Sequence, residues 1–165
     1  MQPTTLIPTE AHAPPRVRLL GELLVERGLV SASDIQKALA FQDQFGGRIG
    51  SILVRLGALS EETLLPVLSE QLGIALLAGG EWPEQPEAIR ELLAASGFSI
   101  DWWLDNGVVA WSTVPGRAIA IARYPLDALV NEALGRCLQD WSWQWRLVRT
   151  QDLDRLLEMA GRSRS

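Results

Sequence analysis

The 165-residue chain has a net charge of −5 and a hydrophobic fraction of 47%, which is enough apolar material for one medium domain or two small ones. It has no basic cluster, so neither DNA or RNA nor an anionic membrane is expected as a partner. Its single cysteine, Cys137, excludes an internal disulfide. No apolar run reaches about 18 residues, so we expect no transmembrane helix. The N-terminus has no basic segment followed by an apolar run, as a secretory signal would, so we expect a cytoplasmic protein.

Both ends of the chain are predicted to lack fixed structure. Residues 1–16 are rich in proline and threonine without periodicity, which predicts a flexible N-terminal lead. This lead contains His12, the single histidine, which we expect to be inert. Residues 161–165, GRSRS, predict a frayed tail.

From Leu19 to Gly73 one pattern occurs twice, at an offset of 29 residues. The first copy reads LLGELLVERGLVSASDIQKALAFQ and the second RIGSILVRLGALSEETLLPVLSEQ, with DQFGG as the link. Small, apolar and amide side chains recur in phase, which indicates an internal repeat. The matched pairs include Gly21 with Gly50, Leu24 with Leu53, Gly28 with Gly57, and Gln42 with Gln71.

Each copy predicts a helix, a turn and a second helix. In the first copy apolar residues recur at helical spacing, Gly28 ends the first helix as a left-handed cap, and Ser31 begins the second helix with Asp34 as a capping box. In the second copy Gly57 and Ser60 take the same places. Pro66 lies inside the last predicted helix and is expected to kink it.

Glycines and prolines near residue 80 predict a boundary between a helical repeat at 17–79 and a small α/β subdomain at 80–160. The subdomain predicts, in order, a helix, two antiparallel strands (VVAWSTV and RAIAIAR), a helix at 126–138, a third strand at 141–148 and a closing helix at 151–159. The fold class is therefore α+β. An N-terminal helical tandem repeat of two helix-turn-helix units precedes a subdomain with a three-stranded sheet, and we expect the helices on one face of that sheet.

All seven tryptophans follow residue 80, and Trp141, Trp143 and Trp145 alternate with polar residues, so they share one strand face. Two interpretations remain open. This face packs beneath the helices as core, or some of the indoles form an exposed docking patch together with Trp102 and Trp103.

The tandem pattern resembles the MshEN domain, the N-terminal module of type II secretion and type IV pilus assembly ATPases that also occurs on some glycosyltransferases. The family motif runs from Arg-Leu-Gly through aliphatic pairs, a Gly and two leucines to a closing Gln, and it occurs twice with a five-residue spacer, as it does here. Family members with intact motifs bind cyclic di-GMP along the two repeats.

The resemblance implies which residues contact this ligand. An arginine can fork onto guanine O6 and N7 or hold a phosphate. The family arginine of the first copy is replaced by Leu19, and Arg18 lies one place earlier, which turns its side chain by about 100° on a helix. Either Arg18 still reaches the ligand or half of the site is lost. The implied ligand-binding residues are Arg18, Leu20, Gly21, Leu24, Gly28, Gln42, Arg48, Ile49, Gly50, Leu53, Gly57 and Gln71.

The chain lacks the residues of several enzyme classes. The single lysine, Lys37, follows no glycine-rich run, so there is no Walker P-loop. Histidine and cysteine are too few for the usual metal sites, and we expect no catalysis, cofactor or metal.

Two functions remain open. The first is a cyclic di-GMP-binding sensor of a bacterial secretion, pilus or exopolysaccharide system, with a secretion or pilus ATPase, a glycosyltransferase or an inner-membrane component as partner. The second is a protein-interaction adaptor that docks such a partner without nucleotide. The residues do not decide whether the chain is free-standing or part of a larger protein.

Overall fold

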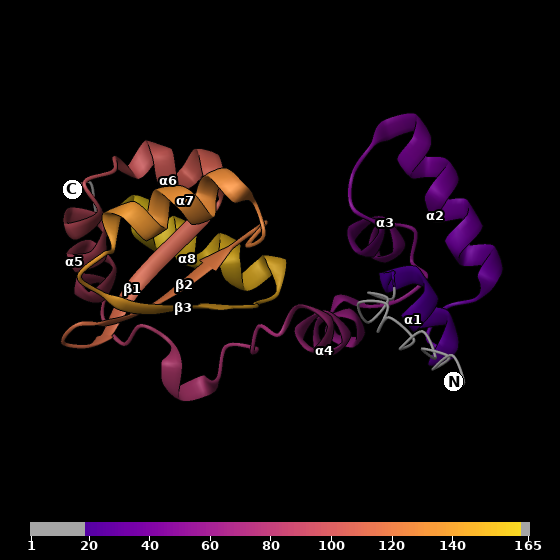
Figure 1. Cartoon of the computed structure of the whole chain (residues 1–165), viewed down its shortest axis with the longest axis horizontal. Coiled ribbons are helices and arrows are strands. Elements are labelled where there is room, and N and C mark those ends of the chain that lie inside the picture. Colours follow the sequence, from indigo (N-terminus) through magenta and orange to yellow (C-terminus); the bar gives the residue numbers. More distant parts are fainter. Residues whose placement is uncertain (1–18, 163–165) are drawn as a thin grey trace, which may run out of the picture. The chain divides into compact units, whose positions relative to one another are not determined.

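The computed structural model describes residues 19–162 (Figure 1). The predicted N-terminal lead, which contains His12, lies outside these residues. Arg18 and the end of the predicted tail also lie outside them. Gly161 and Arg162 still belong to the last helix. The chain forms two compact units that divide between Ser60 and Glu61.

The first unit contains three helices, α1 (Leu20–Glu26), α2 (Ala32–Phe45) and α3 (Ile49–Arg55), and α3 contacts both of the others (Figure 1). The limits of α3 are those of α1 moved by the 29-residue repeat offset. Leu24 and Leu53 occupy equivalent positions, and neither has any exposed surface. The predicted repeat is therefore present in the structure as well as in the sequence.

The same turn ends α1 and α3. Gly28 and Gly57 have φ angles of +71° and +76°. In each copy two backbone bonds close the turn, Gly28 N–H to Val25 O and Leu29 N–H to Leu24 O, both 3.0 Å, with equivalent bonds at Gly57. This is the Schellman pattern that a glycine after a helix predicts.

α2 begins at the predicted capping box. The Ser31 hydroxyl accepts from the Asp34 N–H, and the Asp34 carboxylate accepts from the Ser31 N–H, each at 3.0 Å. Backbone and side-chain hydrogen bonds from Ser31 lower the pKa of Asp34.

The second unit begins with α4 (Glu61–Leu72), which runs through Pro66, followed by a short 3-10 helix, η1 (Gly79–Glu81). By sequence α4 is the last helix of the repeat, whereas its contacts group it with the second unit. The boundary between the repeat at 17–79 and the subdomain at 80–160 stays a prediction from the sequence.

The rest of the second unit is a three-stranded mixed sheet with helices (Figure 1). Its elements are α5 (Pro86–Ser96), α6 (Ile100–Asn106), β1 (Val108–Val114), β2 (Arg117–Ala122), α7 (Ala128–Cys137), β3 (Ser142–Arg146) and α8 (Thr150–Arg162). β1 and β2 are antiparallel, as predicted, and β3 is parallel to β2 because α7 carries the chain back between them.

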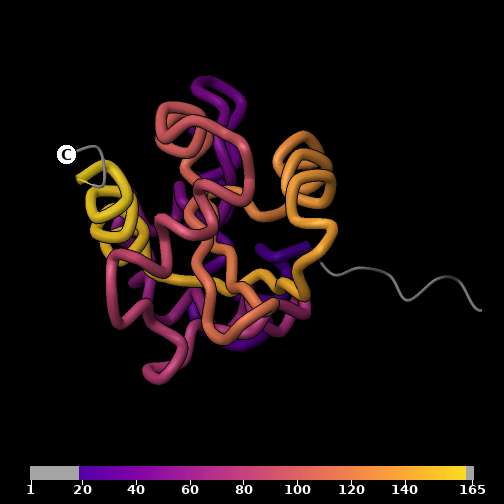
Figure 2. The backbone as a smooth tube through the Cα atoms, turned by 90° about the vertical axis from the view of Figure 1, so that its left-hand side faces the viewer, coloured from indigo at the N-terminus to yellow at the C-terminus, as the bar shows by residue number. Residues whose placement is uncertain are grey.

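The prediction that helices cover one face of this sheet is wrong. Figure 2 shows α7 (orange) and α8 (yellow) on opposite sides of the strands. Four successive residues of β1, Val108 to Trp111, are buried, so both faces of this strand are covered. Trp145 Nε1 donates to Asn131 Oδ1 of α7 at 2.8 Å, whereas Trp111, on the opposite face, donates its Nε1 to Glu81 O at 2.8 Å.

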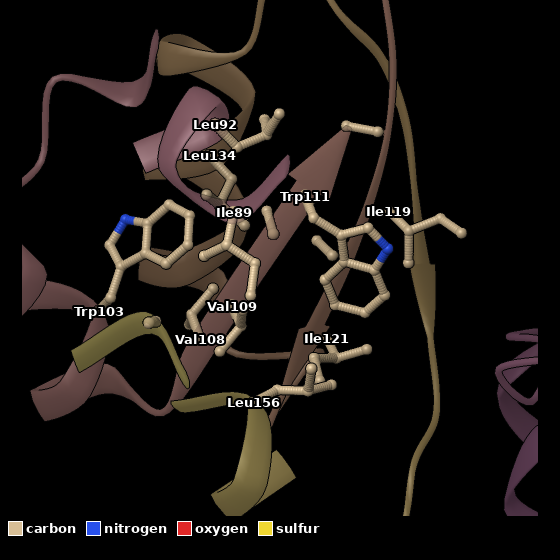
Figure 3. Packing of buried hydrophobic residues seen from close by; sticks show 14 of the residues in the cluster. Ile89, Leu92, Trp103, Val108, Val109, Trp111, Ile119, Ile121, Leu134 and Leu156 are labelled. Carbon is tan, nitrogen blue, oxygen red and sulfur yellow. The ribbon is translucent and has the colours of Figure 1, made fainter. Parts of the chain in front are cut away.

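Two of the seven tryptophans lie in the core of this unit, and the others pack against it. Trp103 and Trp111 have no exposed surface and pack among Ile89, Leu92 and Ile121 (Figure 3). The indoles of β3, with Trp102, are partly buried against the same cluster. Trp103 therefore has no surface to offer a partner, which excludes it from the docking-patch interpretation.

Candidate functional site

Eight of the implied ligand-binding residues form four pairs at equivalent places of the two copies, all on the first unit. Leu20 and Ile49 are the first residues of α1 and α3, and Gly21 and Gly50 are the second. Leu24 and Leu53 lie inside the unit without exposed surface, where they hold the helices together. The turns at Gly28 and Gly57 are exposed.

The paired glycines at the helix starts allow close packing. A Cβ atom on Gly21 would lie 3.3 Å from the Cδ1 atom of Ile35, so α1 and α2 approach closely at this point. Gly50 is buried at the equivalent position of α3. The recurrence of these glycines therefore has a packing reason beside any role in binding.

The link between the copies has a fixed conformation. Gln42 Nε2 donates to Gly47 O at 2.9 Å, and Gly46 N–H donates to Gln42 O at 2.7 Å. Gly46 and Gly47 have φ angles of +73° and +102°, which L-residues rarely adopt. A Cβ atom on Gly47 would lie 3.7 Å from Ile52, so the link rests on α3. Gln42, expected to contact the ligand, thus has a partner within the chain.

Arg48 follows this link directly and precedes the first residue of α3, with an extended backbone and an exposed side chain. Leu19 holds the equivalent place before α1 and exposes 68% of its surface. The repeat therefore presents one arginine and one leucine at corresponding exposed positions, and the structure does not describe Arg18.

Gln71 lies near the end of α4, half-buried and within the second unit. The implied contacts that the structure describes therefore lie on α1, α2 and α3 or beside the ends of these helices, except Gln71, whose ligand contact remains a prediction.

Sequence reasoning missed the ion pairs of the second unit. Glu81 accepts from Arg146 Nε at 3.2 Å, and Arg149 lies between Glu62 and Asp152. Glu81 and Arg146 are 65 residues apart in the sequence, and Glu62 and Arg149 are 87 residues apart. No short sequence pattern predicts pairs between residues so distant in the chain.

Within residues 19–162 no three His, Cys, Asp or Glu side chains gather as a metal site. No described helix has the length and apolar character needed to cross a membrane.

Two curated proteins share sequence with part of the chain. The type IV pilus assembly ATPase PilB of Myxococcus xanthus is 38% identical over 71 residues, which is 43% of this chain and 12% of PilB. The PilB of Thermus thermophilus is 44% identical over 62 residues, or 38% of this chain and 7% of PilB. The chain thus matches only a small part of these relatives' length. No family model matches the chain.

Solved structures resemble nearly the whole chain. A structure of MshE with cdg, cyclic di-GMP, has a TM-score of 0.69 at 26% identity and covers 86% of this chain and 97% of that one. The N-terminal domain of XpsE has a TM-score of 0.61 at 20% identity, covering 85% and 92%, and this second likeness concerns the fold alone. Together with the tandem repeat, these likenesses confirm the predicted resemblance to the MshEN domain.

Proposed function

We propose that the chain is a regulatory module that binds cyclic di-GMP on its helical repeat and controls a bacterial secretion, pilus or exopolysaccharide machine, without ATPase activity of its own. The observation that carries this proposal is the likeness to MshE, whose structure with cyclic di-GMP matches this chain over 97% of its length. The repeat adds support because two equivalent helix pairs suit a ligand made of two equal halves.

The proposed contacts are those that the first unit exposes. Arg48 supplies the positive charge, Leu20 and Ile49 supply apolar surface, and the exposed turns at Gly28 and Gly57 bring backbone close to the ligand. Gly21, Gly50 and the buried pair Leu24 and Leu53 set the helix spacing beneath this surface. Gln42 holds the link that precedes Arg48.

Calorimetric titration of the full chain with cyclic di-GMP tests the proposal, with Arg48→Ala as the variant. Loss of a charge-assisted contact weakens binding roughly tenfold to a hundredfold. Arg136→Ala is the matched control, because Arg136 is also exposed and pairs with Glu132 on α7. No heat signal from the unmodified chain at high micromolar ligand contradicts nucleotide binding and leaves the adaptor function.

The substitution Leu19→Arg restores the family arginine at the position equivalent to Arg48. Because Leu19 is largely exposed, the new side chain requires no repacking. We expect cyclic di-GMP to bind roughly tenfold to a hundredfold more tightly to this variant, measured by the same titration. Unchanged affinity would mean that this half of the repeat makes no charged contact with the ligand.

A further inference from the structure

Phe45 lies at the end of α2 and exposes 66% of its surface, more than any other aromatic side chain in the described part of the chain. An exposed phenyl ring keeps apolar area in contact with water, which costs about 25 cal/mol for each Å². Phe45 is not one of the buried residues of the first unit. Its position therefore calls for another explanation.

The ring of Phe45 is held in place next to the proposed ligand surface. It contacts the ring of Phe41 with a centroid distance of 4.8 Å and an interplanar angle of 43°. Phe45 also follows Gln42 by three residues, so the two side chains leave the same face of α2. The aromatic side chain and the amide that fixes the link are neighbours.

The link keeps Arg48 close to Phe45 along the chain. Gly46 and Gly47 turn the chain between Phe45 and Arg48, and the bond from Gln42 Nε2 to Gly47 O together with the contact of Gly47 on Ile52 fixes that turn. Three residues span at most about 11 Å, so Phe45 and Arg48 leave the chain within that distance. An aromatic ring and an arginine that leave the chain this close together can contact one purine nucleotide, the ring at the flat face of the base and the guanidinium at its polar edge or at the phosphate.

We propose that Phe45 is a stacking platform for one guanine base of the bound nucleotide, with Arg48 contacting the polar edge of that base or the adjoining phosphate. This inference rests on the proposed function and adds a contact from the DQFGG link. Aromatic rings stack on nucleic-acid bases without needing hydrogen bonds, and an arginine forks onto guanine O6 and N7. The two groups then recognise complementary parts of the ligand.

Titration of the full chain with cyclic di-GMP, by calorimetry, tests this platform. We expect Phe45→Ala to weaken binding roughly fivefold to a hundredfold, the effect that loss of one base–aromatic stack produces. Phe45→Trp keeps a π face and retains binding. Phe45→Leu keeps apolar volume without a π face and weakens binding. Leu129→Ala, which truncates a side chain that is 77% exposed on α7, is the control and leaves affinity unchanged.

The outcomes separate this inference from the proposed function. If the unmodified chain binds cyclic di-GMP and Phe45→Ala binds equally well, the stacking platform is wrong and the sensor function stands. If the unmodified chain binds no cyclic di-GMP, both fail. If Phe45→Ala alters the helical circular dichroism, Phe45→Leu decides, since equal affinity for Leu and Phe at this position excludes stacking.

Discussion

Gly28 and Gly57 hold a backbone conformation that costs other L-residues about 1–2 kcal/mol. An added Cβ atom meets nothing within 4 Å at either position, so the cost of Gly→Ala is conformational and not steric. We expect Gly28→Ala and Gly57→Ala each to lower the free energy of unfolding by about 1–2 kcal/mol. Denaturant unfolding followed by far-ultraviolet circular dichroism measures this change.

Gly135 provides the matched control. It lies inside α7, also with no atom near its missing Cβ, but with an ordinary helical backbone. Gly135→Ala should therefore raise the free energy of unfolding by up to about 1 kcal/mol. A loss of stability at Gly135 equal to that at Gly28 contradicts the conformational explanation.

The ion pair of Glu81 with Arg146 should make the free energy of unfolding depend on pH. Burial raises the pKa of Glu81, but hydrogen bonds from Arg146 and the Ala78 N–H outweigh burial and hold this pKa below its ordinary value of 4.5. A carboxyl group whose pKa falls on folding stabilises the fold above its unfolded pKa, and this stability is lost as the pH falls through the folded pKa. Glu81→Gln should thus cost about 1.5–3 kcal/mol at pH 7 and progressively less below about pH 4.

Thermal unfolding of Glu81→Gln across this pH range, followed by tryptophan fluorescence, tests the prediction because Trp111 donates to Glu81 O. Glu87→Gln is the control, since Glu87 pairs with Arg90 at 3.8 Å on the surface and contributes little. A difference between Glu81→Gln and the unmodified chain that stays constant down to pH 3 would contradict the charge pairing.

Residue roles could be predicted wherever they depend on near neighbours. The left-handed turn at Gly28 and the capping box at Ser31 follow from spacings of a few residues. The bond from Gln42 to Gly47 was not anticipated, because the family motif suggested a ligand for that amide. The pairing of Glu81 with Arg146 could not be predicted, since it depends on how η1 meets β3.

Among the elements, α4 and α8 meet through four polar residues, Glu61, Glu62, Arg149 and Thr150, here called the α4–α8 cluster. Glu61 accepts from the Thr150 N–H and, at 3.1 Å, from its hydroxyl. The Arg149 guanidinium lies 3.2 Å from the Glu62 carboxylate and 3.0 Å from the Asp152 carboxylate. Asp152, with the larger effect, and Glu62 both raise the pKa of Arg149. The first turn of α4 thereby holds the start of α8.

Removing Arg149 should loosen this attachment without unfolding the sheet. We expect Arg149→Met to speed amide hydrogen exchange roughly fivefold in the first turns of α4 and α8, because both lose a polar partner. Hydrogen exchange followed by mass spectrometry measures this. Arg136→Met, which breaks an exposed pair within α7, should leave exchange at α4 and α8 as it was. Equal exchange in both variants would contradict a role for the cluster.

The strands could be predicted from their composition, but their surroundings were misjudged. VVAW in β1 and AIAI in β2 are continuous apolar runs, which are typical of strands covered on both faces, whereas alternation would indicate one covered face. α6 was also missed, because seven residues ending at the turn signal Asp105-Asn106-Gly107 carry little periodicity. Ser99 before this helix and Gly107 after it are typical helix-capping residues, and they could have indicated α6.

At the scale of the whole molecule, the aromatic reporters are unevenly distributed. All seven tryptophans belong to the second compact unit, and α1, α2 and α3 contain none. Tryptophan fluorescence therefore reports the sheet and its helices, while circular dichroism reports every helix. The first unit is small, and small units bury a lower fraction of their surface and are less stable.

We expect the two probes to give different thermal midpoints, with circular dichroism showing an earlier transition that is silent in fluorescence. Cyclic di-GMP at about 100 times its dissociation constant should then stabilise the state that binds it by about 2.7 kcal/mol and raise the midpoint of the earlier transition. Because the proposed contacts lie on α1, α2 and α3, the fluorescence midpoint should move less. A shift confined to fluorescence would place the ligand on the second unit and contradict a site on the repeat helices.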